Sequence, residues 1–111
     1  MAEPAPDLVF VELGANDHWN GDPGPAFLPA YTAFLERVRA AYPHARVYPV
    51  AWRGHGAAVP DAIVLEAPPK GHGRGCVGHP NAKTQAWIAA QLIERVCRDA
   101  KDAFCGGVAA R

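Results

Sequence analysis

The sequence has 111 residues, the usual size of one domain, so a second independently folded unit is not expected. Eleven basic and eleven acidic side chains cancel, which excludes the basic surfaces of nucleic-acid binders and polybasic membrane-surface proteins. No apolar run approaches the ~18 to 20 residues of a membrane span. Residues 1–7 do not resemble a signal peptide, so any export signal would lie upstream and the compartment stays open.

The first half of the chain predicts a strand, a long loop and a helix. Residues 7–13 form a near-continuous apolar run that stops at Gly14, which is typical of a buried parallel strand. The polar segment 14–25 is rich in Gly, Pro, Asn and Asp, as binding loops are. Apolar residues recur at helical spacing over residues 25–42, so we expect an amphipathic helix that ends at Pro43.

Two short strands are expected next. Residues 46–51 favour a strand, in which Pro49 indicates a sheet edge or a strand end because proline has no N–H to donate. A Gly-rich connection over residues 52–60 leads to a third strand at residues 62–66.

The last part of the chain predicts a second long loop and a closing helix. The loop covers residues 67–80 and is again rich in glycine. Asn81 is a suitable N-cap for a helix over residues 82–98, and residues 99–111 form a tail.

This order of elements predicts an α/β fold with three parallel strands and two main helices. Ligands of such sheets bind outside the carboxyl ends of the strands, so we expect both long loops to meet at one crevice. Three strands also leave one edge and one face of the first strand without partners, and we expect self-association through that edge.

Two motifs lie in the loops after strands of this sheet. The first loop opens with Gly-Ala-Asn-Asp at residues 14–17, and the second carries Gly-Cys-Val-Gly-His-Pro-Asn at residues 75–81. In these motifs the chain resembles the SGNH hydrolases, the GDSL-type esterases and acylhydrolases. Residues 6–47 are similar to the third conserved block of that family together with its next helix and strand. Residues 75–92 are similar to the fifth block.

Within that superfamily the chain most resembles carbohydrate esterase family two, deacetylases of acetylated sugars and xylan. The likeness rests on Gly-Asp-Pro-Gly-Pro-Ala-Phe at residues 21–27 and on the Gly-Cys-x-x-His-Pro loop. The resemblance implies a partial three-layer flavodoxin-like fold, with residues 6–98 as the C-terminal part of an SGNH domain and residues 99–111 as its tail.

The resemblance also implies roles for particular residues. Asn16 would donate its amide to the oxyanion, and His79 would be the general base. Gly14 would let the loop turn close to the substrate, and Asp17 would hold the loop. Trp19 is the best aromatic candidate for substrate contact. A carbohydrate or acyl ester is the implied substrate, and no cofactor is implied.

The sequence departs from the family pattern in three respects. It contains no serine, and both the nucleophile block and the second block, with its oxyanion-hole glycine, are missing. The acid that usually precedes the catalytic histidine is replaced by Cys76 and Val77, which resembles members that use a Ser–His dyad. We therefore expect a fragment of a serine esterase that is inactive alone, or alternatively a non-catalytic remnant.

Other interpretations of the same residues stay open. Asn16 and Asp17 suit an Asx-type turn, and His79 could be an ordinary loop histidine. His72, Cys76 and His79, with His55 and Asp17, could instead form a zinc-binding loop.

Three cysteines are too few for a disulfide framework and cannot all pair within the chain.

Overall fold

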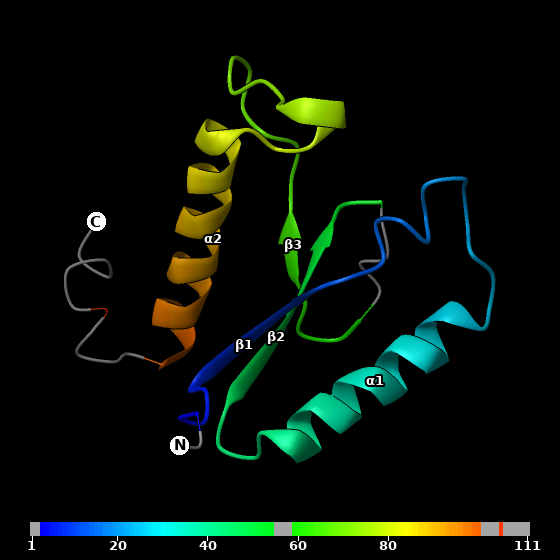
Figure 1. Cartoon of the computed structure of the whole chain (residues 1–111), viewed down its shortest axis with the longest axis vertical. Coiled ribbons are helices and arrows are strands. Elements are labelled where there is room, and N and C mark those ends of the chain that lie inside the picture. The colour runs from blue at the N-terminus through cyan, green and yellow to red at the C-terminus, as the bar shows by residue number, and fades with distance from the viewer. Residues whose placement is uncertain (1–2, 55–58, 101–104, 106–111) are drawn as a thin grey trace. The chain divides into compact units, whose positions relative to one another are not determined.

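The computed structural model describes residues 3–54, 59–100 and 105 (Figure 1). Its elements, in chain order, are β1 (Leu8–Glu12), α1 (Phe27–Ala41), β2 (Arg46–Trp52), β3 (Ile63–Leu65), the 3₁₀ turn η1 (Cys76–Gly78) and α2 (Ala82–Ala100). The chain divides into two compact units, residues 1–66 and 67–111. None of the helices in the described part is long and apolar enough to cross a membrane.

The first unit holds the whole sheet. Its strand order is β1-β2-β3 and both pairs are parallel, with Val9 opposite Val47 and Val50 opposite Ile63. Helix α1 connects β1 to β2, the arrangement that parallel neighbours require. The predicted α/β class, with three parallel strands and two main helices, is confirmed.

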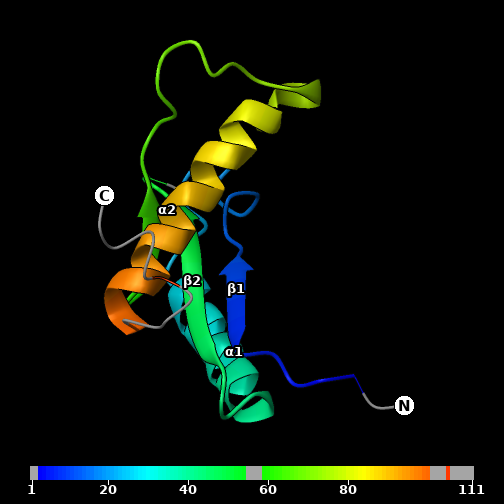
Figure 2. The same cartoon turned by 90° about the vertical axis from the view of Figure 1, so that its left-hand side faces the viewer.

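Helix α1 packs against one face of the sheet, as Figure 2 shows. Val11 of β1 lies in one buried cluster with Tyr31, Leu35 and Val59. The Tyr31 hydroxyl donates to the Val11 carbonyl oxygen at 3.2 Å, which satisfies the only polar atom of that side chain. Burial raises the pKa of Tyr31. Each large side chain buried here contributes roughly 1.5 to 3 kcal/mol, so the cluster fixes the end of β1 against the helix.

Pro49 does not mark a sheet edge, because β2 is the central strand. The Arg46 N–H donates to the Asp7 carbonyl oxygen just before β1. Because the backbone groups of successive strand residues point alternately to the two neighbouring strands, the backbone nitrogen of Pro49 faces β3. Pairing with β3 begins only at Val50. The missing N–H therefore costs no ladder hydrogen bond, which explains why a central strand tolerates this proline.

β1 and β3 are the outer strands of the sheet, and among the described strands β1 has a partner only in β2, so one of its edges is free. Because the Asp7 carbonyl faces β2, the backbone groups of Leu8, Phe10 and Glu12 face outward. Phe10 is 39% exposed. We propose that this edge pairs with a second copy when the 111-residue chain is isolated.

Sedimentation velocity of the isolated chain is expected to show association that grows with concentration. Leu8→Pro removes one outward N–H without breaking a bond to β2, so it should reduce the association. Leu8→Ala removes the same side chain and keeps the N–H, and it should associate as the wild type does. A monodisperse monomer at all concentrations would contradict the edge proposal.

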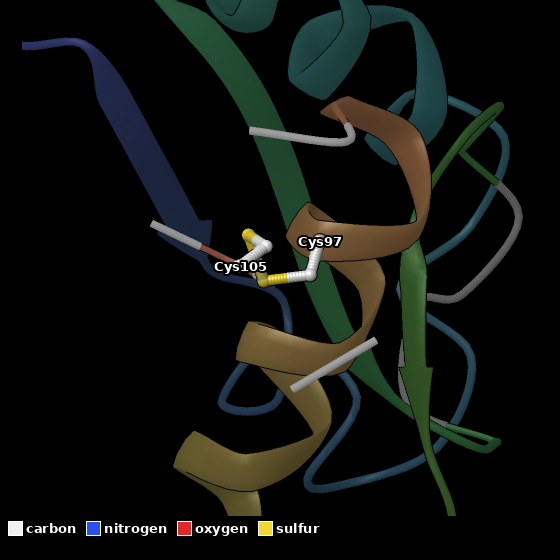
Figure 3. Close-up of a disulfide and its surroundings, with 2 residues drawn as sticks. All are labelled: Cys97 and Cys105. Carbon is white, nitrogen blue, oxygen red and sulfur yellow. A yellow bond between two sulfur atoms is a disulfide. The ribbon is translucent and has the colours of Figure 1, made fainter. Parts of the chain in front are cut away.

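The second unit contains α2 and a disulfide that the cysteine count did not anticipate. Cys97 of α2 is bonded to Cys105, eight residues later, and both are buried (Figure 3). Cys76 is the free, exposed cysteine. The helix itself ends at Ala100, two residues beyond the prediction.

Replacing both bonded cysteines with Ala is expected to lower the free energy of unfolding by about 2.5 kcal/mol, the loop-closure entropy of so short a loop. Urea unfolding checks this, with reduced wild-type protein as the matched comparison and Cys76→Ala as the control. An unchanged midpoint in the double variant would show that the bond contributes nothing to stability.

Candidate active site

The Asn16 loop, residues 13–26, begins where β1 ends. Gly14 is buried and has a φ of +107°, a conformation that glycine adopts without strain. Its carbonyl oxygen accepts two hydrogen bonds from His18, one from the backbone N–H at 3.1 Å and one from ring Nδ1 at 2.7 Å. The Trp19 N–H donates to the Asn16 carbonyl oxygen at 3.2 Å. Asn16 thus lies in the middle of a tight turn.

The Asn16 and Asp17 side chains are exposed, and neither makes a hydrogen bond with another described residue. The Asx-type contact in this loop belongs to Asp22, whose Oδ1 accepts from the Gly24 N–H at 2.8 Å. The Asn16 amide is therefore available as a donor, and the turn is held by His18 rather than by the Asp17 carboxylate.

His18 is the residue of this loop that sequence reasoning missed. Its ring is half-buried and meets the Phe27 ring edge-on, with 4.8 Å between centroids. A histidine four residues after a glycine is no known loop signature, so only the fold reveals the contact. Trp19, by contrast, is 77% exposed, as a substrate-contact residue would be.

A charged pair, Arg53 and Glu66, lies directly after the carboxyl ends of β2 and β3. The Arg53 guanidinium follows β2, and its Nε donates to both oxygens of the Glu66 carboxylate at 2.8 and 2.6 Å. This hydrogen-bonded pair lowers the pKa of Glu66 and raises the pKa of Arg53. Beside them the indole N–H of Trp52 donates to Glu12 at the end of β1, at 3.1 Å.

The His79 loop, residues 67–81, belongs to the second unit. The Gly75 N–H donates to the His79 carbonyl oxygen at 2.7 Å, and the His79 N–H donates to the Cys76 carbonyl oxygen at 3.1 Å. These bonds close a small turn in which Val77 is 91% exposed, with a φ of +54°. The His79 imidazole is exposed and has no hydrogen-bond partner among the described residues.

Asn81 joins this loop to α2. Its Oδ1 accepts from the Thr84 N–H at 3.0 Å, so the predicted N-cap is confirmed. Its Nδ2 donates to the His72 carbonyl oxygen at 2.6 Å. The buried Thr84 hydroxyl donates to the Gly73 carbonyl oxygen at 3.1 Å. The helix start thus fixes the loop that carries His79.

Replacing Asn81 with Ala is expected to cost about 2 kcal/mol of unfolding free energy, because the cap and the bond to His72 are both lost. Asn81→Asp keeps the capping oxygen and should cost about half as much. Thermal or urea unfolding measures both, with Asn20→Ala, an exposed loop asparagine, as the control. Equal stability of the Ala and Asp variants would show that the capping oxygen contributes nothing to stability.

The zinc hypothesis is wrong as a three-ligand site. Within the described ranges no group of three His, Cys, Asp or Glu side chains is placed to hold a metal ion, so His72, Cys76 and His79 do not assemble one. His72 instead turns its ring edge toward Trp87, with 6.4 Å between centroids. His55, a further candidate ligand, lies outside the described residues.

The structure therefore places Gly14, Asn16, Asp17 and Trp19 together in one loop at the carboxyl end of β1. His79 lies in the loop that precedes α2 in the second unit. That the two loops meet stays a prediction.

Comparison with known proteins adds the family. The sequence model of the GDSL-like lipase/acylhydrolase family matches residues 1–107, nearly the whole chain. No curated protein and no solved structure gives a significant match. The parallel sheet and its helices agree with the flavodoxin-like fold of SGNH hydrolases. Because this match covers nearly the whole chain and the parallel sheet carries the Asn16 loop, the chain belongs to the GDSL-like lipase/acylhydrolase family.

Proposed function

We propose that this chain supplies the oxyanion-hole amide and the general base of a serine esterase. The single observation that carries the proposal is the Asn16 turn, whose free amide comes directly after a parallel strand in a GDSL-like chain. The 111 residues contain no serine, so the nucleophile has to come from chain outside them, and these residues alone would be inactive.

The proposed reaction assigns one step to each side chain. The serine Oγ attacks the acyl carbon while His79 takes its proton. The carbonyl oxygen becomes an oxyanion, to which the Asn16 amide donates a hydrogen bond worth roughly 3 to 4 kcal/mol in the transition state. His79 then gives the proton to the leaving alcohol, and water releases the acyl group by the same route. This sequence of steps needs no metal or organic cofactor.

We propose acetylated carbohydrate, or a related ester, as the substrate. The resemblance of residues 21–27 and of the His79 loop to carbohydrate esterase family two supports this choice. The exposed indole of Trp19, three residues after Asn16, offers an apolar face of the kind on which sugar rings stack.

A second candidate, a non-catalytic remnant of such an enzyme, is favoured by the absence of serine from the sequence. Mapping the 5′ end of the transcript separates the two. The esterase proposal predicts in-frame codons ahead of Met1 that encode a strand, Gly-Asp-Ser and a later glycine-bearing loop. A stop codon immediately upstream would favour the remnant.

A further inference from the structure

The Gly14 carbonyl oxygen fixes the tautomer of His18. A carbonyl oxygen can only accept, so the 2.7 Å contact requires that Nδ1 carries the proton. The same oxygen accepts the His18 backbone N–H at 3.1 Å, so backbone and ring close the turn together. Neutral histidine in water favours the proton on Nε2, which makes the Nδ1–H form a signature of this contact.

The His18 ring also contacts helix α1. Phe27, the first residue of α1, meets it at 4.8 Å between centroids with an interplanar angle of 88°. The ring centroids of Phe27 and Tyr31 are 5.8 Å apart, and the Tyr31 hydroxyl donates to the Val11 carbonyl oxygen of β1. The contacts thus run from the end of β1, through α1, back to the loop that comes after β1.

Asn16 lies between the two ends that this contact joins. Gly14 and His18 bracket it, and the Trp19 N–H holds its carbonyl oxygen. With both ends fixed, the backbone of Asn16 has little freedom, so the turn fixes the point from which its exposed side-chain amide extends. Oxyanion stabilisation requires donors that are held in place before the reaction.

We infer that His18 is a positioning residue, which holds the Asn16 turn through an Nδ1–H bond to Gly14. The inference rests on the proposed function for the role of Asn16. The bond itself is testable without any activity.

Nitrogen-15 NMR of the 111-residue chain, recorded at a pH where histidine is neutral, tests the tautomer. The expected spectrum has a protonated Nδ1 and an unprotonated Nε2 for His18. An Nε2–H tautomer as the main species would overturn the inference.

Three variants test the positioning in the same chain. In His18→Ala the Trp19 amide is expected to exchange with solvent about tenfold faster, the effect of one lost hydrogen bond. His18→Asn keeps a donor near the position of Nδ1 and should restore exchange to within about threefold of wild type. His44→Ala, an exposed histidine outside the loop, should leave it unchanged. Equal exchange in the Ala and Asn variants would overturn the inference.

Where hydrolysis is measurable in the longer protein, His18→Ala should lower kcat about tenfold at an unchanged KM, with rescue by His18→Asn. An unchanged kcat in His18→Ala, beside a lowered one in Asn16→Ala, would overturn the positioning role. If Asn16→Ala itself leaves kcat unchanged while the NMR results hold, the proposed function fails and the Nδ1–H bond stands.

Discussion

In the proposed serine esterase, replacing His79 with Ala is expected to lower kcat by about 10⁴-fold or more, because both proton transfers lose their carrier. The loss should be similar for any ester with a poor leaving group, since the alcohol then needs the proton most. Steady-state kinetics with an acetyl ester measure it. Added imidazole should recover part of the rate, because it replaces the missing base.

Two control variants test whether the loss of activity is specific to His79. Cys76→Ala changes another exposed residue of the same turn, and His44→Ala removes an exposed histidine elsewhere. Both should retain nearly full activity. Near-wild-type turnover in His79→Ala would remove the general-base assignment altogether.

Replacing Asn16 with Ala is expected to lower kcat by about 10²- to 10³-fold while KM changes little. The amide would act on the oxyanion, which exists only in the transition state, so substrate binding should not suffer. Asn16→Asp should lose at least as much, because a carboxylate would repel the oxyanion.

Asn20→Ala provides the control in the same loop, since Asn20 is also exposed and its side chain makes no hydrogen bond with another described residue. Its kinetics should match wild type. A raised KM at unchanged kcat in Asn16→Ala would make Asn16 a substrate-binding residue and contradict the oxyanion role.

The sequence was most informative where one periodicity dominates. The apolar run after Asp7 and the helical spacing around Tyr31 and Leu35 predicted β1 and α1 to within a few residues. Asn81 was recognisable as an N-cap because the cap is a local interaction. These features depend on neighbours in the chain, which a sequence displays directly.

Features that depend on distant partners were predicted poorly. The edge interpretation of Pro49 was wrong, because the hydrogen bond it lacks depends on where β3 begins to pair. The Cys97–Cys105 bond depends on the chain returning to α2, which a count of three cysteines cannot show.

The candidate site divides in the same way. Asn16 and His79 could be proposed because they stand in short motifs of a known family, and the family is confirmed. His18 belongs to no such motif, and its role emerges only from its distances to Gly14 and Phe27. The same holds for Asp22, whose carboxylate makes the Asx-type contact that the sequence also allows for Asn16 and Asp17.

The most direct test of the account is labelling of the active protein by a serine-directed fluorophosphonate, with peptide mapping of the labelled product. We expect one label per chain, on a serine outside these 111 residues, with loss of activity in proportion. Labelling should be abolished in His79→Ala and retained in Cys76→Ala. Ester hydrolysis by the 111-residue chain alone, or undiminished labelling in His79→Ala, would contradict the account.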